Sequence, residues 1–182
     1  MNNDGNNSKK VKPSILKRLN LGSVGAILNL LSYFFGGILS IFGYSMILLK
    51  VKKLSEKYGD KSIFKTYLYA YVYTLFIFIV SLIGGLIIGN NINNYDEFYT
   101  NYTLFKNLMI IIFIIYISAI IVSYLIKQAY TKLSQYDNKL KIFKKIGNLY
   151  FYGALSSIFI IGIFIVIYAQ ILEMKAYSEL DL

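Results

Sequence analysis

The side chains that usually perform chemistry are scarce in this sequence. Cysteine and histidine are both absent from its 182 residues, which removes thiolate nucleophiles, imidazole bases and the common zinc, copper and haem ligands. Asp96 and Glu97 are adjacent and could meet a cation, but two carboxylates alone make a weak site. No glycine-rich phosphate loop follows a strand, and no serine has a recognisable base partner. We therefore expect no enzyme, no metal site and no bound cofactor.

The apolar stretches contain polar groups but no charged ones. Asn29, Gln170 and serine hydroxyls suffice for hydrogen bonds between helices, whereas the intramembrane charges that mark ion pathways and proton relays are missing. Small residues at four-residue spacing would share one helix face that another backbone can approach closely. These residues are Ser32, Gly36 and Ser40, and then Ser81, Gly85 and Gly89. Packing inside the protein is their expected role, and a self-association surface is the alternative.

Composition predicts a membrane protein. The chain is 57% hydrophobic with a mean hydropathy of +0.55, against about 45–50% apolar residues in soluble domains. Four uncharged stretches exceed or equal the roughly 20 residues that cross a bilayer, and none alternates as a barrel strand would. They cover residues 22–49, 66–90, 107–126 and 146–172. We expect an all-α integral membrane protein with four transmembrane helices.

One membrane domain accounts for most of the chain. It spans residues 21–175, after a polar, basic N-terminal tail of residues 1–20 and before a short C-terminal tail of residues 176–182. Ile15, Leu16 and Leu19 in the first tail have helical spacing and predict a short interfacial helix.

Two lysine-rich loops share a motif. In each, a Lys-Leu-Ser triplet is followed after seven residues by Ile-Phe-Lys: Lys53, Leu54, Ser55, Ile63, Phe64 and Lys65 in the first, and Lys132, Leu133, Ser134, Ile142, Phe143 and Lys144 in the second. The match predicts two tandem helical hairpins, a parallel internal repeat. Chance similarity under shared interfacial demands is the alternative.

Basic residues predict the orientation in the membrane. Six lysines lie in 50–65 and six in 127–145, but only Lys106 flanks the loop between the second and third segments. By the positive-inside rule we expect both lysine-rich loops to be cytoplasmic, and loop 90–106 and the C-terminus to be external, in the plasma membrane. A full first span then puts the N-terminus outside, although its tail is also basic. A re-entrant first segment broken near Gly36 and Gly37 is the alternative.

Two glycosylation sequons begin at Asn6 and Asn101, and both fall on the side expected to be external. In so asparagine-rich a chain they are weak support. Whether either asparagine is glycosylated does not follow from the sequence.

The formal net charge of +10 has a membrane explanation. Its lysines cluster beside the apolar stretches, where they can contact anionic lipid headgroups, and no folded basic face is indicated that would bind nucleic acid.

Several apolar segments resemble the uncharacterised, largely archaeal membrane family called domain of unknown function 996. The resemblance covers roughly residues 20–175 and is carried by four stretches: LGSVGAILNLLS (21–32), GGILSIFGYSMILL (36–49), LSEKYGDKSIFKTYLYAY (54–71) and LYFYGALSSIFIIGIFIVIYAQIL (149–172). The chain departs from the family in a composition that is unusually rich in tyrosine and lysine. The resemblance implies a plasma-membrane protein and no functional residue.

The absence of catalytic groups favours a non-enzymatic, multi-pass protein that is a subunit or assembly factor of a membrane complex. Its partner would be another membrane protein or a second copy of the same chain. The alternative is a small transporter or lipid-handling protein for a neutral or lipid substrate. A polar central cavity would favour that alternative, and a dry core would count against it.

Overall fold

The protein is helical throughout the part of the chain that its structure, a computed structural model, describes: residues 20–35, 37–91 and 102–180. The helices are α1 (Leu21–Leu31), α2 (Ile38–Tyr58), α3 (Lys61–Asn91), α5 (Tyr102–Leu133), α6 (Lys141–Leu155) and α7 (Ile161–Ser178), with a short 3-10 helix, η2 (Asn138–Leu140). Among the described residues, three helices are long and apolar enough to cross a membrane: α3, α5 and α7.

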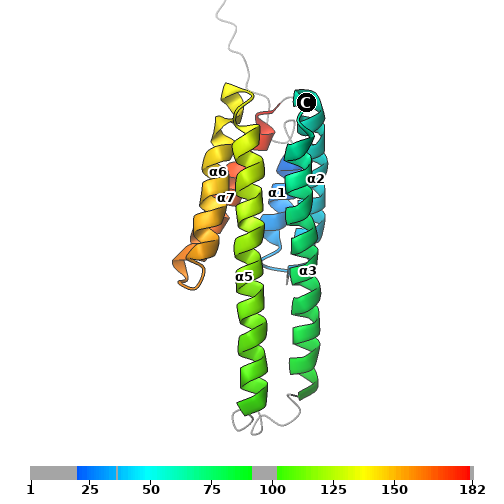
Figure 1. Cartoon of the computed structure of the whole chain (residues 1–182), viewed down its shortest axis with the longest axis vertical. Helices are drawn as coiled ribbons and strands as arrows, with labels where there is room; N and C mark the ends of the chain where they lie inside the picture. Colours follow the sequence, from blue (N-terminus) through cyan, green and yellow to red (C-terminus); the bar gives the residue numbers. More distant parts are fainter. Residues whose placement is uncertain (1–19, 36, 92–101, 181–182) are drawn as a thin grey trace, which may run out of the picture.

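Two helices are much longer than the rest. α3 and α5 have 31 and 32 residues, and they pack against each other along the molecule. Figure 1 shows the other four helices gathered around one end of this pair, while α3 and α5 continue alone beyond them.

The first apolar segment is two helices, not the single full span expected over 22–49. α1 ends at Leu31, and Gly37 has a left-handed φ of 85° in the turn before α2, a conformation that glycine adopts without strain. The two helices pack closely because glycines meet at their crossing: a Cβ added at Gly25 would lie 2.5 Å from the carbonyl oxygen of Gly43. The break falls where the re-entrant alternative placed it, although Gly36 itself lies outside the described residues.

The fourth segment, expected as one helix over 146–172, is also two helices. α6 ends at Leu155, and residues 156–160 form a turn before α7. Glycine again permits the close approach, since a Cβ added at Gly153 would lie 3.2 Å from the carbonyl oxygen of Gly162. The Tyr116 hydroxyl of α5 donates a hydrogen bond to the Leu155 carbonyl at 2.9 Å and so holds this turn against the long helix.

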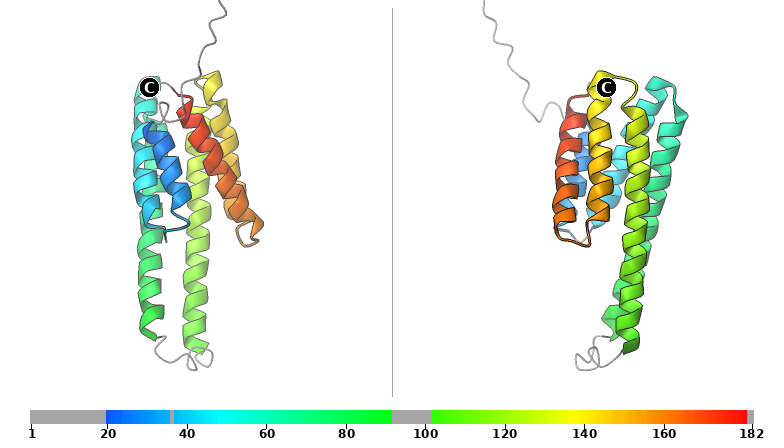
Figure 2. Two further views of the ribbon diagram at one scale, coloured as in Figure 1. Left: turned by 180° about the vertical axis from the view of Figure 1, so that it is seen from behind. Right: turned by 60° about the vertical axis from the view of Figure 1, so that its left-hand side comes forward.

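Successive helices are neighbours around a ring. α1 packs on α2, α2 on α3, α3 on α5, α5 on α6 and α6 on α7, and α7 closes the ring against α1. Figure 2 shows both short hairpins beside one end of the long pair. The tandem repeat of two full-span hairpins stays a prediction, because the helices equivalent in that scheme differ in length and two of its segments are broken.

Both described chain ends lie at the same end of the bundle as the lysine-rich loops. Asn20 caps α1, and its side-chain amide donates hydrogen bonds to the carbonyls of Tyr177 and Leu180. Leu180 also borders a hollow lined by Tyr58 and Lys139 from the two loops. This geometry differs from the expectation that the C-terminus lies across the membrane from these loops, since α7 returns beside α6 instead of continuing as one span.

The two lysine-rich loops contact each other directly. The rings of Tyr58 and Tyr136 stack with centroids 5.2 Å apart, and the Tyr136 hydroxyl donates a hydrogen bond to Asp60 Oδ2 at 3.0 Å. Asp60 also accepts from the Ser62 amide at 2.8 Å, at the start of α3. Hydrogen bonding from Ser62, reinforced by Tyr136, holds the pKa of the Asp60 carboxyl below its ordinary value.

Candidate functional site

A carboxylate lies at the centre of the lysine-rich end of the bundle. Glu173 on α7 is 1% exposed, and it accepts a hydrogen bond on Oε2 from the Tyr150 hydroxyl at 2.6 Å. The Tyr130 hydroxyl donates to Oε1, and it lies 3.0 Å from the hydroxyl of Tyr177. Three helices, α5, α6 and α7, thus supply the tyrosines around one carboxylate. Hydroxyl donors on both carboxylate oxygens are what makes such a burial tolerable.

Glu173 is not among the residues expected from the sequence, because the fourth uncharged stretch ends at residue 172, directly before the charge. α7 continues without interruption to Ser178, so the carboxylate lies within the helix bundle. The signal available in the sequence was helical spacing: Ala169, Glu173 and Tyr177 are four residues apart, and all three are buried on one face of α7. An apolar run is therefore a poor guide to where a membrane-embedded helix ends.

Aromatic rings enclose this centre. Phe143 packs its ring against Tyr130 and Tyr177, with centroids 5.1 and 5.0 Å apart. Tyr67 stacks on Tyr130 at 5.8 Å, and its own hydroxyl is buried without a hydrogen-bond partner among the described residues. The rings exclude water from Glu173 and fix the two donor tyrosines in place.

Next to the carboxylate, a cavity of about 340 Å³ lies between the two short hairpins and the long helix pair. Its lining comes from every long element except α1, together with both hairpin turns: Tyr33, Tyr44, Thr74, Ile77, Ala119, Val122, Ser123, Ile126, Tyr150, Ala154, Ser157, Ile163 and Val166. None of these side chains is charged. The volume is at the lower end of the range for small-molecule sites, which are mostly apolar with a few polar groups.

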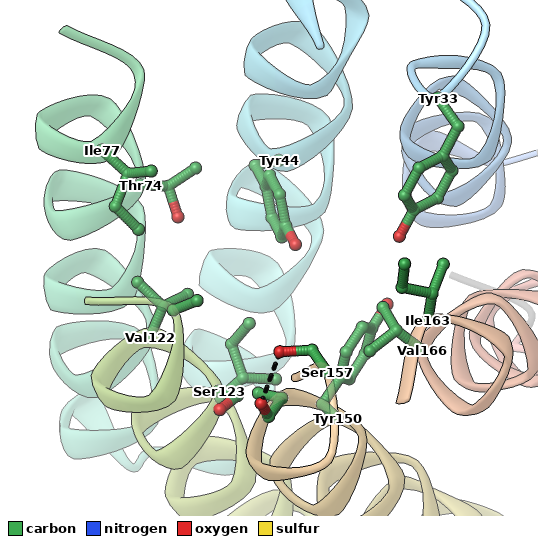
Figure 3. A pocket seen from close by; sticks show the side chains of 13 residues that line it. Tyr33, Tyr44, Thr74, Ile77, Val122, Ser123, Tyr150, Ser157, Ile163 and Val166 are labelled. Carbon is green, nitrogen blue, oxygen red and sulfur yellow. Dashed lines mark hydrogen bonds between the residues drawn. The ribbon is translucent and has the colours of Figure 1, made fainter. Parts of the chain in front are cut away.

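Three tyrosines, Tyr33, Tyr44 and Tyr150, contribute hydroxyls to this cavity beside those of Thr74, Ser123 and Ser157, as Figure 3 shows. Tyr150 connects it to Glu173, and Tyr33 accepts a hydrogen bond from Gln170 Nε2 at 3.4 Å, so two α7 side chains one turn apart support two lining tyrosines. The Tyr44 hydroxyl makes no hydrogen bond to any residue that the structure describes. It is therefore available to a bound molecule.

The two serine hydroxyls in the cavity lining are already paired with backbone groups. The hydroxyls of Ser123 and Ser157 donate to backbone carbonyls of their own segments, at 2.9 and 2.8 Å, instead of to a base that could activate them. Within the described residues, no group of three or more acidic, histidine or cysteine side chains could hold a metal ion. Asp96 and Glu97 lie outside those residues, as do the sequons at Asn6 and Asn101 and the N-terminal segment expected to form an interfacial helix.

The residues of the shared loop motif have two kinds of environment. Leu54, Ile63, Leu133 and Phe143 are buried in the core, Ser55 and Ser134 are buried as well, and Phe64 and Ile142 are half-buried. Lys53, Lys65 and Lys144 are exposed, and Lys132 donates a hydrogen bond to the Ser62 hydroxyl at 3.1 Å. The apolar residues of the motif thus form part of the core at the lysine-rich end, and Lys132 links the two loops.

The residues of the small-residue sets that the structure describes are only partly covered by the rest of the chain. Ser32 is buried beside the turn and Ser40 is half-buried, but Ser81 and Gly85 are exposed on α3, and nothing lies within 4 Å of a Cβ added at Gly85. Gly36 and the surroundings of Gly89 are outside the described part of the chain. Close packing occurs instead at Gly25, Gly43, Gly153 and Gly162.

A helical bundle in which three described helices are long and apolar enough to cross a membrane is the arrangement of a membrane protein. The family model for a protein of unknown function, DUF996, matches residues 39–171, and the chain belongs to this family. An uncharacterized protein of the archaeon Methanocaldococcus jannaschii, MJ1644, is 38% identical over 172 residues, which are 93% of this chain and 95% of that protein. No solved structure matches the chain.

Proposed function

We propose that the protein lies in the plasma membrane with α3 and α5 as full spans and the two short hairpins as re-entrant elements. On α5, Lys106 and Lys127 bound an uncharged stretch of about 30 Å, which is the thickness of the hydrocarbon core. The lysine-rich end, with the two loops and both described chain ends, is cytoplasmic by the positive-inside rule. This orientation removes the conflict between the basic N-terminal tail and the basic loops.

Within that frame, the cavity is a binding site for an amphipathic molecule, and the protein handles a lipid or another neutral, largely apolar ligand. The observation that carries this proposal is the cavity of about 340 Å³ with a tyrosine hydroxyl that has no partner among the described residues. Tyr33 and Ser157 lie in the hairpin turns, so the cavity reaches the level at which both turns meet the long helices. A ligand would place its chain against Ile77, Val122 and Val166 and its hydroxyl or carbonyl group at Tyr44.

A photoreactive long-chain alcohol, with a diazirine in its alkyl chain, tests the site in reconstituted vesicles. The expected labels are cavity residues, and Ala119→Phe should reduce them several-fold because the added ring fills the cavity. Ile117→Phe is the matched control, since Ile117 is 40% exposed on the same helix and does not line the cavity. Labels confined to lipid-facing residues, and equal in both variants, would overturn the proposal.

The Tyr44 hydroxyl should contribute a single hydrogen bond to the alcohol. Tyr44→Phe keeps the ring and removes only that group, so the affinity should fall by a factor of about 2 to 12, the equivalent of 0.5–1.5 kcal/mol. A probe of the same chain length without a polar group should bind both forms equally. If both probes lose the same affinity, Tyr44 acts through packing and not through its hydroxyl.

A second candidate function is that of a subunit in a membrane complex. Its support is that Ser81 and Gly85 are exposed on α3 and that no atom of the described chain lies within 4 Å of a Cβ added at Gly85, so that another helix backbone could approach there. Crosslinking in native membranes should then give a defined complex that Gly85→Leu abolishes. A chain that migrates as a monomer with or without this substitution would refute the candidate.

A further inference from the structure

The two halves of the molecule differ in cross-section. At the lysine-rich end, the six helices α1, α2, α3, α5, α6 and α7 lie around one another, whereas beyond the hairpin turns only α3 and α5 continue (Figures 1 and 2). The described structure is therefore broad at one end and narrow at the other. In a bilayer, these ends correspond to different leaflets only if the turns lie near the midplane.

Contacts along the long helices put both turns at that depth. Tyr116, which holds the α6–α7 turn, is midway between Lys106 and Lys127 on α5. On the other side, Gly37 and Ser40 line a hollow together with Ile77 and Ser81 of α3. The apolar part of α3, from Thr66 to about Ile88, has its midpoint near Ile77. Each hairpin thus ends close to the middle of the span.

The lengths of the four short arms agree with this depth. From α1 to α7, their uncharged parts are residues 21–31, 38–49, 146–155 and 161–172, each about 15–18 Å long as a helix. That is about half of a 30 Å hydrocarbon core.

The turns themselves suit a hydrocarbon environment. Phe34 is 81% exposed in the first turn and Phe159 is 69% exposed in the second. Their backbones are hydrogen-bonded within each turn, for example from Gly37 N to Ser32 O at 2.9 Å and from Phe159 N to Ser156 O at 2.9 Å. Irregular backbone at this depth is costly where its polar groups are left unpaired, and hydrogen bonds within each turn, together with the Tyr116 contact to the second turn, reduce that cost.

We propose that this protein is a membrane wedge that senses or generates curvature. Four additional helices, each about 10–11 Å across, occupy about 300–400 Å² more in the leaflet at the lysine-rich end than in the opposite leaflet. A leaflet expanded in this way bends the bilayer so that its own side is convex. The partner implied by the shape is a lipid bilayer whose cytoplasmic surface is convex. This inference depends on the half-depth placement proposed above and not on what the cavity binds.

Curvature sorting of reconstituted, fluorescently labelled full-length protein tests the wedge. The chain has no cysteine, so a single Lys57→Cys carries the dye and also reports, through a membrane-impermeant quencher, which way each molecule faces. Molecules with the lysine-rich end outside should have a several-fold higher density on small vesicles than on large ones. Molecules in the opposite orientation are the matched control, and they should be depleted from the same small vesicles.

Depth measurements separate a failure of the wedge from a failure of the placement. The chain also lacks tryptophan, so Phe35→Trp and Phe159→Trp are single fluorophores at the two tips, with Tyr136→Trp as a reference in the loops. Quenchers on lipid chains should find both tips near the bilayer centre. Tips at the far headgroups would overturn the placement, and the wedge with it. Central tips combined with equal densities in both orientations would overturn the wedge alone.

Discussion

Substituting Gly25 by alanine should separate α1 from α2 and destabilise the protein. The added Cβ would lie 2.5 Å from the Gly43 carbonyl oxygen and 2.8 Å from Ile47 Cγ1, and a backbone oxygen in a helix cannot rotate away. Overpacking of this kind costs about 3 kcal/mol at the upper end of its range, less about 0.5–1 kcal/mol gained because alanine is the better helix former. The expected loss in the free energy of unfolding is therefore about 2 kcal/mol.

Gly85→Ala is the matched control, because nothing lies within 4 Å of the added methyl group. It should leave the stability unchanged or raise it by about 0.5–1 kcal/mol. The measurement is the fraction unfolded in mixed micelles as denaturing detergent increases, read from thiol labelling of a reporter, Ala129→Cys, whose native side chain is 0% exposed.

The double variant provides a stricter check on the crossing. A Cβ at Gly43 would lie 2.6 Å from the Gly25 carbonyl, so either substitution pushes the same two helices apart. Once the first has done so, the second should cost less, and the combined loss should be below the sum by about 1 kcal/mol. If Gly25→Ala behaves like Gly85→Ala, the close crossing, and with it the packed hairpin, is refuted.

Three further predictions concern the ends and turns of the bundle. Single cysteines in the two lysine-rich loops and at both described chain ends should all react with an impermeant reagent from one side of the membrane; labelling of the C-terminal cysteine from the opposite side would contradict the returning α7. Because the Asp60 pKa lies below its ordinary value, the carboxylate stabilises the start of α3 at neutral pH and loses this effect as the pH falls through about 4 and below. Hydrogen-exchange protection of the Ser62 amide should therefore decrease in that pH range, and Asp60→Asn should remove the pH dependence. Tyr116→Phe should destabilise the protein by about 0.5–1.5 kcal/mol through the hydrogen bond lost to Leu155. Tyr124→Phe should be near neutral, because the Tyr124 hydroxyl has no hydrogen bond among the described residues and the ring contact with Phe151 is kept.

The membrane class and the helical class were readable from the sequence because both depend on local composition. Long uncharged runs predict helices of membrane-spanning length, and their lack of alternation favours helices over barrel strands. The meeting of the two lysine-rich loops at one end of the bundle also follows the charge count. Family membership, stated first as a resemblance, is confirmed by the family model over residues 39–171.

The two broken segments could not be placed by apolarity alone, although their length gave a warning. Residues 22–49 and 146–172 would each form a helix of about 40 Å, clearly longer than the hydrocarbon core. Neither break contains proline, the usual marker of a helix end. Only the glycines on both sides of each break, which let the two arms pack, indicate a hairpin. Whether a glycine in a helix marks its end or allows close packing with another helix depends on tertiary contacts.

The site was beyond sequence reasoning for a different reason. Glu173 meets Tyr130 and Tyr150, which are 43 and 23 residues away, and the cavity beside it is assembled from five helices and two turns. Such contacts depend on how the hairpins fold back, so a single sequence without that fold offers no way to bring these side chains together.

The position of Glu173 follows from the same unequal cross-section that defines the wedge. A carboxylate can be kept away from water only where protein surrounds it and provides donors for its oxygens. In the narrow half, α3 and α5 alone could not enclose such a group, whereas in the broad half α7 is part of a closed ring of helices. The hairpins that broaden one end of the described bundle therefore also enclose the buried carboxylate and the tyrosine-lined cavity. Changing the hairpins should affect both together, while filling the cavity should leave the shape intact.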